Sequence, residues 1–380
     1  MKIALDIGNS AIKGSILDNN NKYIAPLDQP SAVFTVEDSK YMMFHDPNDY
    51  YIQVLESPLK HYAYPTAIGH VALDRPGYEE FDVSSTTYKS NHEITTALLF
   101  GSIAPHIDGD TDAKLAVSVP IVEAKTLGLI AEYQTLLTGT HKIRIFRPTG
   151  TFDCNVTFSA VRVFNEGQAG FFGLLDTRDT NFQLEMSTVY QSLGEETSPI
   201  GDLEDFLIVD IGEGTTDLAV FRNKKFNPEF SYSITSGYGN LLEDAIKNAQ
   251  RNHLTIESRK ELQKVLSSTN KRRQARKEKW ASYVNPTKER FIKLVTDTIL
   301  NAYGTKDYFD AIIFLGGGFS ALTGYTTDFG QVSMEDDQLF TTLKSKLESN
   351  HKDVDLIFGV PRPFSGRINE RGLVQVLTTM

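Results

Sequence analysis

Apolar runs typical of buried strands alternate along the chain with stretches that have helical spacing. The strand-like runs are IALDI, KGSIL, LAVSV, IRIF, FLIVDI, DLAVF and AIIFLG. This alternation predicts an α/β architecture. Helices are predicted over 240–250, after the glycine turn SGYG, and over 287–303, where Thr287 would be the N-cap after Pro286. The second helix would bury one face, formed by Phe291, Leu294, Val295 and Ile299.

Two predicted strand pairs share one pattern of residues. Residues 2–17 read KIALDIGNSAIKGSIL, and residues 206–221 read FLIVDIGEGTTDLAVF. In each, an apolar strand ends at an aspartate, a turn of glycine and hydroxyl residues follows, and a second apolar strand returns. Either pair alone also fits an ordinary β-hairpin, in which aspartate and glycine only suit the turn geometry. Two matching copies in one chain favour a shared chemical purpose.

The residue types in the first hairpin suit a magnesium-bound phosphate. Asp6 ends a buried strand, where a carboxylate can hold Mg²⁺ through water. The turn of Gly8, Asn9 and Ser10 can direct main-chain N–H groups at phosphate oxygens. Lys13 lies on the returning strand, where alternation can point its ammonium group back toward the turn.

The second hairpin repeats this arrangement. Asp210 ends the first strand and Asp217 begins the return. The turn between them consists of Gly212, Glu213, Gly214, Thr215 and Thr216. Two such turns facing each other would grip a polyphosphate from both sides.

A third glycine-rich stretch, FLGGGFSAL, follows a predicted strand. Gly316, Gly317 and Gly318 leave an open surface against which a flat base or sugar can pack. Taken alone, this stretch is equally a turn at the start of a helix.

Composition limits the classes of protein that the chain can belong to. Its 380 residues favour two or three domains, and 40% hydrophobic with 23% charged residues is ordinary for a globular protein. A net charge of -11 gives no general attraction to nucleic acid or anionic lipid. The single cysteine, Cys154, excludes an intramolecular disulfide. Without a membrane-span or signal-type pattern, we expect a cytoplasmic protein.

Two segments differ in composition from the rest. Residues 19–95 are rich in aromatic and turn residues, which indicates a small elaboration of the first domain. Residues 268–280, STNKRRQARKEKW, are rich in Lys and Arg. This run is either a solvated helix face or a contact for nucleic acid or a protein partner.

The order of these motifs resembles that of the actin superfamily of nucleotide-dependent ATPases. The two hairpins resemble the phosphate motifs of this superfamily, and FLGGGFSAL is similar to its adenosine motif. FNEGQAGFFGLLD (164–176) and INERGLVQVL (368–377) resemble its two connector segments. The resemblance implies two related α/β domains with a ribonuclease H-like core flanking a nucleotide cleft. Domain I would be 1–165 plus 367–380 with a subdomain at about 19–95, and domain II 166–366 with a subdomain at about 245–305.

The resemblance also implies roles for single residues. Asp6, Asp210 and Asp217 would hold hydrated Mg²⁺, and Lys13 would bind the β and γ phosphates. The phosphate-binding turns would be Gly8, Asn9, Ser10, Gly212, Glu213, Gly214, Thr215 and Thr216. Gly316, Gly317 and Gly318 would line the adenosine pocket, with Ser236 and Gly237 near the ribose.

Glu166 would orient the attacking water. A positioned carboxylate can orient a nucleophile and accept its proton in phosphoryl transfer. Gln168 is a rival for this role, and Glu166 can alternatively be a surface carboxylate that caps the following helix.

Within the superfamily, the chain most resembles the ParM/StbA-type bacterial actins that segregate plasmids. A chaperone of this superfamily would need a long extension after the second connector, and a membrane-bound recruiter would need an amphipathic tail. The sequence gives neither pattern, so we expect neither function. The resemblance implies ATP (possibly GTP) with Mg²⁺ as cofactors and polymerisation into polar filaments. A DNA-binding adaptor on a centromere-like plasmid site would be the partner, with no direct DNA contact and no membrane. Segments 41–64 and 268–280 are candidate polymerisation surfaces.

Two other function classes remain open at this point. One is a monomeric small-molecule kinase or nucleotide sensor, and the other is a chaperone-like clamp that binds nucleotide without turnover.

Overall fold

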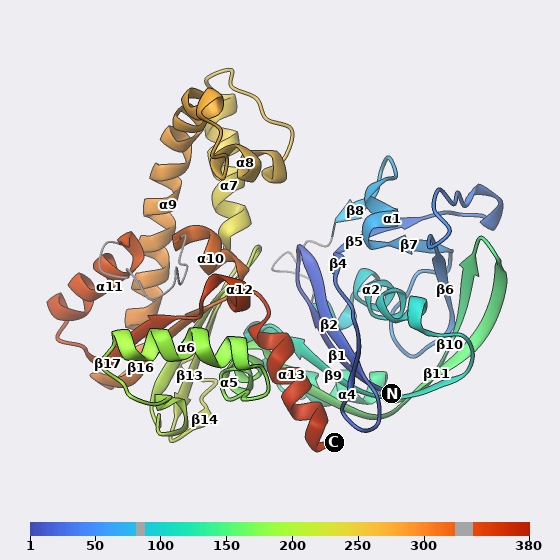
Figure 1. Ribbon diagram of the computed structural model, residues 1–380, viewed down its shortest axis with the longest axis horizontal. Helices are drawn as coiled ribbons and strands as arrows, with labels where there is room; N and C mark the ends of the chain where they lie inside the picture. Colours follow the sequence, from blue (N-terminus) through green and yellow to red (C-terminus); the bar gives the residue numbers. More distant parts are fainter. Residues whose placement is uncertain (81–87, 324–336) are drawn as a thin grey trace. The chain divides into compact units, whose positions relative to one another are not determined.

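The computed structural model describes residues 1–80, 88–323 and 337–380. The chain forms two compact units, one of Met1–Asp176 with Arg367–Met380 and one of Thr177–Gly366 (Figure 1). Residues 81–87, which belong to the segment 19–95, lie outside the described residues.

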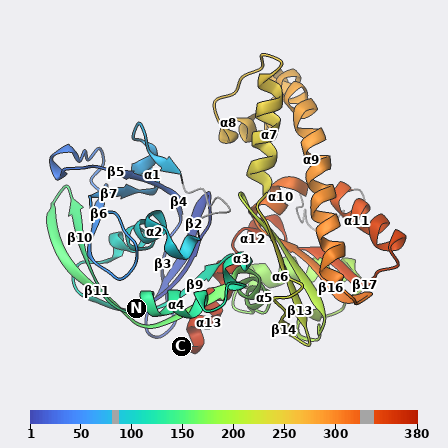
Figure 2. The same ribbon diagram turned by 180° about the vertical axis from the view of Figure 1, so that it is seen from behind.

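Unit 1 is built on a mixed, eleven-stranded sheet. Its order is β3 (Tyr23–Pro26), β2 (Ala11–Leu17), β1 (Lys2–Ile7), β9 (Thr111–Val119), β11 (Gly150–Asn165), β10 (Gly139–Arg147), β6 (Tyr51–Glu56), β7 (Thr66–Ile68), β5 (Ala32–Thr35) and β8 (Glu79–Glu80), with β4 (Gln29–Pro30) paired to β2. The long strands β10 and β11 curve together along their length (Figure 2). The helices of unit 1 are α1 (Gly69–Leu73), α2 (Glu93–Ile103), α3 (Ile121–Ala124), α4 (Leu129–Leu137), α5 (Glu166–Leu174) and α13 (Ile368–Thr379), with short 3-10 turns η1 (Ser39–Tyr41), η2 (Lys89–Asn91) and η3 (Ala104–His106).

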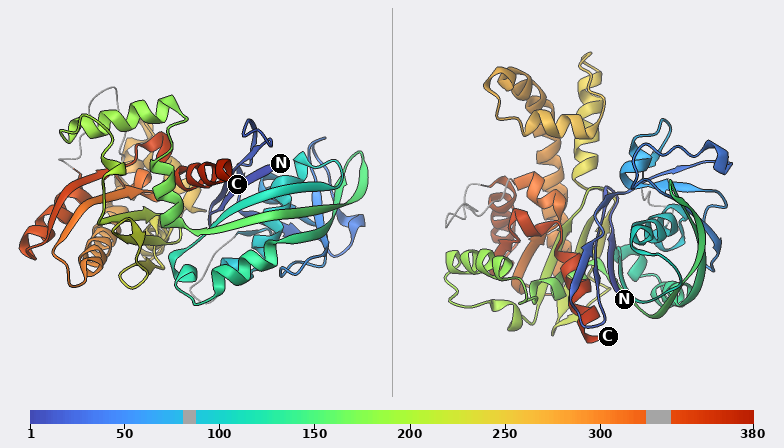
Figure 3. Two further views of the ribbon diagram at one scale, coloured as in Figure 1. Left: turned by 90° about the horizontal axis from the view of Figure 1, so that it is seen from below. Right: turned by 45° about the vertical axis from the view of Figure 1, so that its right-hand side comes forward.

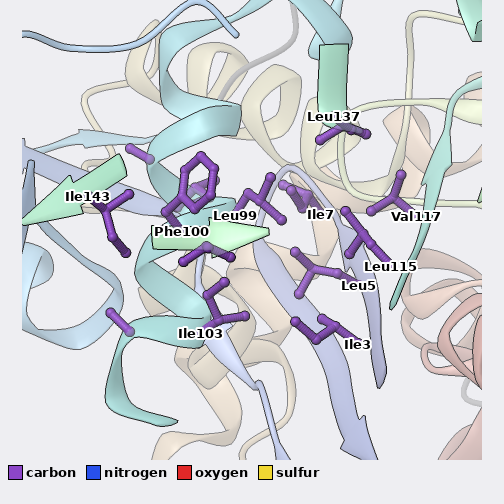
Figure 4. Packing of buried hydrophobic residues seen from close by; sticks show 14 of the residues in the cluster. Ile3, Leu5, Ile7, Leu99, Phe100, Ile103, Leu115, Val117, Leu137 and Ile143 are labelled. Atoms are coloured by element: carbon purple, nitrogen blue, oxygen red, sulfur yellow. The ribbon is translucent and has the colours of Figure 1, made fainter. Parts of the chain in front are cut away.

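Alternation along β1 gives the strand two different buried faces. One face packs into the main apolar core, which includes α2 and β9 (Figure 4). The labelled side chains from these elements are Ile3, Leu5, Ile7, Leu99, Phe100, Ile103, Leu115 and Val117. The opposite face carries Lys2, Ala4 and Asp6.

Small residues let α5 and α13 pack tightly on that opposite face. Ala4, Ala116, Ala169, Leu373 and Leu377 form one buried cluster there. A Cβ added at Gly372 would lie 1.8 Å from Ala169 O, so the two helices meet backbone to backbone. Asp6 therefore lies on the face of the sheet that these two helices cover.

Unit 2 is built on a mixed, six-stranded sheet. Its order is β14 (Lys225–Phe226), β13 (Thr216–Arg222), β12 (Phe206–Ile211), β16 (Tyr308–Leu315) and β17 (Asp353–Gly359), with β15 (Tyr232–Ile234) paired to β13. Its helices are α6 (Thr180–Ser192), α7 (Tyr238–Gln250), α8 (Arg259–Leu266), α9 (Gln274–Tyr303), α10 (Gly317–Thr323), α11 (Gln338–Ser349) and α12 (Arg362–Ser365), with 3-10 turns η4 (Pro199–Gly201) and η5 (Lys271–Arg273). Helices α7 and α9 pack together and project from this sheet (Figure 3).

The two sheets share one internal order of strands. In unit 1 the order β2-β1-β9-β11 contains one antiparallel pair followed by two parallel pairs. In unit 2 the order β13-β12-β16-β17 has the same sequence of pairings. The hairpin repeat in the sequence is therefore one part of a larger repeat in three dimensions.

Every strand predicted from an apolar run is confirmed, and so is the helix at 240–250, which forms the larger part of α7. The sixteen-residue strand β11 was not predicted, although TFDCNVTFSAVRVFN alternates apolar and polar residues over much of its length. Helix α5 groups with unit 1, so 166–176 fall with the first unit rather than the second. This assignment follows from the packing of α5 on α13.

The predicted start of the helix at Thr287 is wrong. Helix α9 begins at Gln274 and runs through Pro286, because buried Trp280 and Val284 anchor its first half. The hydroxyl of Thr287 donates to Val284 O at 2.7 Å instead of capping a helix start. Leu294 is also wrongly placed in the buried face, since it is 41% exposed.

The basic run 268–280 spans η5 and the start of α9, and most of its side chains are exposed except that of Trp280. Among the residues that the structure describes, no helix combines the length and the apolar character needed to cross a bilayer.

Candidate functional site

The first hairpin places Asp6 and Lys13 directly opposite each other. They are register partners of β1 and β2, so their side chains share one face of the sheet. Asp6 is buried and accepts a hydrogen bond from Ser118 Oγ at 2.9 Å. A carboxylate and an ammonium group are thus presented together at the end of β1, as the sequence predicts.

The turn after β1 is held from both sides. Gly8 N donates to Ala11 O at 3.0 Å, which closes the turn. Ser31 Oγ donates to Gly8 O at 2.6 Å, and Ser31 N donates to Ser10 O at 3.2 Å. Because Ser31 occupies carbonyl oxygens, the turn keeps a fixed shape. Within the described part of the chain, the buried Oδ1 of Asn9 has no protein hydrogen-bond partner, so it can accept a hydrogen bond from water or a ligand.

Glu166 is the first residue of α5 and is buried. Asn165 caps this helix by accepting from Gln168 N at 2.8 Å, and Asn165 Nδ2 donates to Gln168 Oε1 at 2.7 Å. The side-chain amide oxygen of Gln168 is therefore already hydrogen-bonded to Asn165. Asn165, and not Glu166, therefore caps this helix.

Lys89 is a residue of this region that the sequence analysis missed. Its Nζ lies 2.9 Å from Glu166 Oε1, and both side chains are buried. Burial by itself would lower the pKa of Lys89, but the carboxylates of Glu166, Asp6 and Glu123 raise it above the ordinary value. A single lysine in TYKSNH carries no signal by which the sequence could have revealed it.

The second hairpin brings two aspartates together. Asp210 and Asp217 are register partners of β12 and β13, and they are 7% and 1% exposed. Gly212 N donates to Thr215 O at 2.9 Å, the same closure that Gly8 makes in unit 1. Like charges directly opposite each other on a sheet are destabilising, and a bound cation offsets that cost.

The loop before α7 lies directly against the turn of this hairpin. Tyr238 N donates to Gly212 O at 2.9 Å, and Gly239 N donates to Glu213 O at 2.8 Å. Thr216 Oγ1 donates to Ser236 O at 2.8 Å. A Cβ added at Gly237 would lie 2.6 Å from Gly212 O, so the close approach requires glycine.

The glycine-rich stretch 316–318 packs on the same turn. Gly316 has a φ of +100°, and a Cβ added there would lie 2.3 Å from Asp210 Oδ1. A Cβ added at Gly318 would lie 2.5 Å from Gly212 O. Gly316 is held further by Ser365, a residue that the sequence analysis missed, whose Oγ donates to Gly316 O at 3.0 Å.

Unit 2 therefore brings its predicted residues into one neighbourhood. These residues are Asp210, Gly212, Glu213, Gly214, Thr215, Thr216, Asp217, Ser236, Gly237, Gly316, Gly317 and Gly318. Gly317 is exposed beside them. The buried Oγ of Ser320 has no hydrogen-bond partner among the described residues. A nucleotide hydroxyl or phosphate could satisfy that atom.

The carboxylates fit Mg²⁺ held through water rather than a closed protein site. In the described residues, no group of three or more His, Cys, Asp or Glu side chains has a metal-binding arrangement. Mg²⁺ usually keeps several waters and uses one or two carboxylates together with substrate phosphates. Asp6 in unit 1 and the Asp210–Asp217 pair in unit 2 have that character.

Removing one charge of the Asp210–Asp217 pair is expected to separate stability from metal binding. Asp217→Asn should raise the stability of the metal-free protein by about 0.5–1 kcal/mol, because a buried like-charge pair is relieved. It should also reduce the increase in Tm that Mg²⁺ with nucleotide produces. Thermal melts in EDTA and in Mg²⁺ with ADP measure both effects, and the exposed Asp202→Asn is the control. An unchanged Mg²⁺-dependent increase would contradict the metal assignment.

The comparisons with known proteins agree with this architecture. The family model described as archaeal actin homologue MreB-like, C-terminal, matches residues 208–325. No curated protein matches the sequence. Among solved structures, Bacillus thuringiensis ParM with ATP matches with a TM-score of 0.58 at 14% identity, over 99% of this chain and 98% of that one.

Two further solved structures match over the whole chain. The pCBH ParM non-polymerisable quadruple mutant has a TM-score of 0.61 at 18% identity, and covers 100% of this chain and 99% of its own. The archaeal actin homologue Ta0583 has a TM-score of 0.63 at 13% identity, with the same coverage. The chain therefore has the actin-like α/β fold, built on two mixed sheets.

Proposed function

We propose that the chain is an actin-like ATPase of ParM type, which binds ATP with Mg²⁺ and forms polar filaments. Its role would be the segregation of plasmid DNA. The observation that carries this proposal is the pair of hairpins, each with a buried aspartate at the end of its first strand and a glycine-closed turn after it. The turns would supply main-chain donors to the phosphates, and Asp6, Asp210 and Asp217 would hold hydrated Mg²⁺.

Glu166 supports turnover rather than binding alone. It is a buried carboxylate at the start of α5, in the same unit as Asp6 and Lys13. Phosphoryl transfer to water needs a polar group to orient the nucleophile while a metal ion and amides absorb charge. Glu166 has the chemistry for that task, which favours an ATPase over a clamp without turnover.

The proposal of filament formation is supported by the similarity in fold to ParM structures. One is a ParM solved with ATP, and another is a ParM described as a non-polymerisable mutant. A polar filament requires a head-to-tail interface whose repeated operation does not close into a ring. Segments 41–64 and 268–280 remain the candidate surfaces, although 41–64 includes the largely buried strand β6.

In plasmid segregation, an adaptor protein rather than this chain would bind the DNA. The net charge of -11 opposes direct binding of the chain to DNA. The DNA-binding adaptor would sit on a centromere-like plasmid site and engage filament ends in the cytoplasm.

Light scattering and pelleting after addition of nucleotide test the proposal. With Mg²⁺ and ATP, we expect assembly above a critical protein concentration, followed by disassembly as phosphate is released. Parallel samples with GTP and with EDTA separate nucleotide preference from metal dependence. No assembly at protein concentrations up to tens of micromolar would favour a monomeric kinase or nucleotide sensor.

A further inference from the structure

A buried charge cluster in unit 1 surrounds Lys89. Its ammonium group lies 2.9 Å from Glu166 Oε1, and the two side chains are only 8% and 10% exposed. Asp6 and Glu123 also act electrostatically on Lys89. One lysine is therefore shared among carboxylates that come from β1, α3 and α5.

The backbone of Lys89 is fixed by a second buried carboxylate. Glu123 is fully buried, and its Oε1 accepts from Lys89 N at 2.6 Å. Its Oε2 accepts from Ser90 N at 3.1 Å. Because both carboxylate oxygens of Glu123 bind main-chain N–H groups of η2, the backbone of Lys89 is fixed. Its side chain therefore has little freedom to move away from Glu166.

Two arginines of α13 and its N-cap pair with other carboxylates. On α13, which packs against α5, Arg367 pairs with Glu370 at 2.6 Å and with Asp28 at 2.5 Å. Arg371 Nε lies 3.9 Å from Asp176 Oδ2. The ion pair that the structure gives for Glu166 is the one with Lys89.

We propose that Lys89 is a positioning residue for Glu166, which it holds as an anion in one orientation, and that Glu123 positions Lys89. This inference rests on the proposed ATPase function. A carboxylate paired with a buried cation is a weaker base, so Glu166 orients the attacking water and does not keep its proton. The proton then leaves with the phosphate product or to solvent.

A double-mutant cycle tests the proposal. Lys89→Met should lower kcat by about 10- to 100-fold, because a misplaced orienting group loses near-attack geometry. Lys89→Arg should restore most of the rate. In a Glu166→Gln background, Lys89→Met should cause little further loss, since its effect acts through the carboxylate.

A titration measures the charge effect directly. Without the neighbouring cation, the pKa of Glu166 should rise, and the acid limb of the kcat profile should move to higher pH. Carbon-13 NMR of labelled glutamate, assigned with Glu166→Gln, follows this titration without any turnover. Lys89→Met removes the cation that pairs with buried Glu166, so the Lys89→Met/Glu166→Gln protein, in which both charges are removed, controls for folding.

Loss of the positioning role and loss of the ATPase function give different experimental results. An unchanged titration of Glu166 in Lys89→Met, or an equal loss of rate in both backgrounds, would overturn the positioning role. A wild-type protein that releases no phosphate would instead overturn the proposed ATPase function, while the titration still decides whether Lys89 controls Glu166.

Discussion

Replacing Glu166 with glutamine is expected to slow ATP hydrolysis by about 10²- to 10³-fold while ATP binding is retained. Loss of a group that orients the attacking water costs a factor of this order, because near-attack geometry is lost. Glutamine keeps the size of the side chain but loses the charge that pairs with Lys89 at 2.9 Å. Phosphate release under single-turnover conditions measures the rate, and binding of a fluorescent ATP analogue measures affinity.

Gln168→Ala is the matched control for this prediction. Gln168 lies two residues further along the same helix, and its carbonyl accepts from Asn165 Nδ2 at 2.7 Å. We expect this variant to lose about 1 kcal/mol of stability, because a contact of the helix cap is removed. Its rate of ATP hydrolysis should stay within about threefold of wild type, because Glu166 is unchanged. If the Gln168→Ala variant hydrolysed ATP slowly and the Glu166→Gln variant kept the wild-type rate, Gln168 rather than Glu166 would be the residue that orients water.

Gly316→Ala is expected to destabilise the protein by about 2–5 kcal/mol and to abolish nucleotide binding. Its φ of +100° is unfavourable for alanine, and the new Cβ would lie 2.3 Å from both Asp210 Oδ1 and Ile211 O. Backbone strain and overpacking each cost about 1–3 kcal/mol. Chemical denaturation measures the free energy of unfolding, and a nucleotide-dependent shift in Tm reports binding.

Gly201→Ala supplies the comparison in the same unit. A Cβ at Gly201 meets nothing within 4 Å, and its backbone is not in the left-handed region. We expect its free energy of unfolding to stay within about 0.5 kcal/mol of wild type, as for most surface changes. Equal destabilisation of the two variants would show that the close packing of Gly316 on Asp210 has no special importance.

Local patterns predicted the framework of this fold well. The apolar runs gave β1, β2, β9, β10, β12, β13 and β16 because buried strands need continuous apolar residues. The start of α9 was missed because tertiary burial of Trp280 outweighs the local penalty of Pro286.

The site was predictable only where its residues form a local motif. In each hairpin, a strand end and a glycine turn only a few residues apart mark the aspartate, Asp6 or Asp210, and the turn proposed to bind phosphate. Lys89 and Glu166 are 77 residues apart, and Ser365 and Gly316 are 49 residues apart. Contacts at such separation depend on the whole packing of a unit, and the sequence carries no local signal of them.

The position of α13 also determines the order in which the protein can fold during synthesis. Unit 2 is one continuous stretch, Thr177–Gly366, whereas unit 1 needs Arg367–Met380 in addition to its first 176 residues. Since domains tend to fold as their residues leave the ribosome, unit 2 can complete its core first. The face of β1 and β9 that carries Ala4 and Ala116 stays open until Leu373 and Leu377 arrive to cover it. In the nascent chain, this face of β1 and β9 is therefore solvent-exposed until α13 has been synthesised.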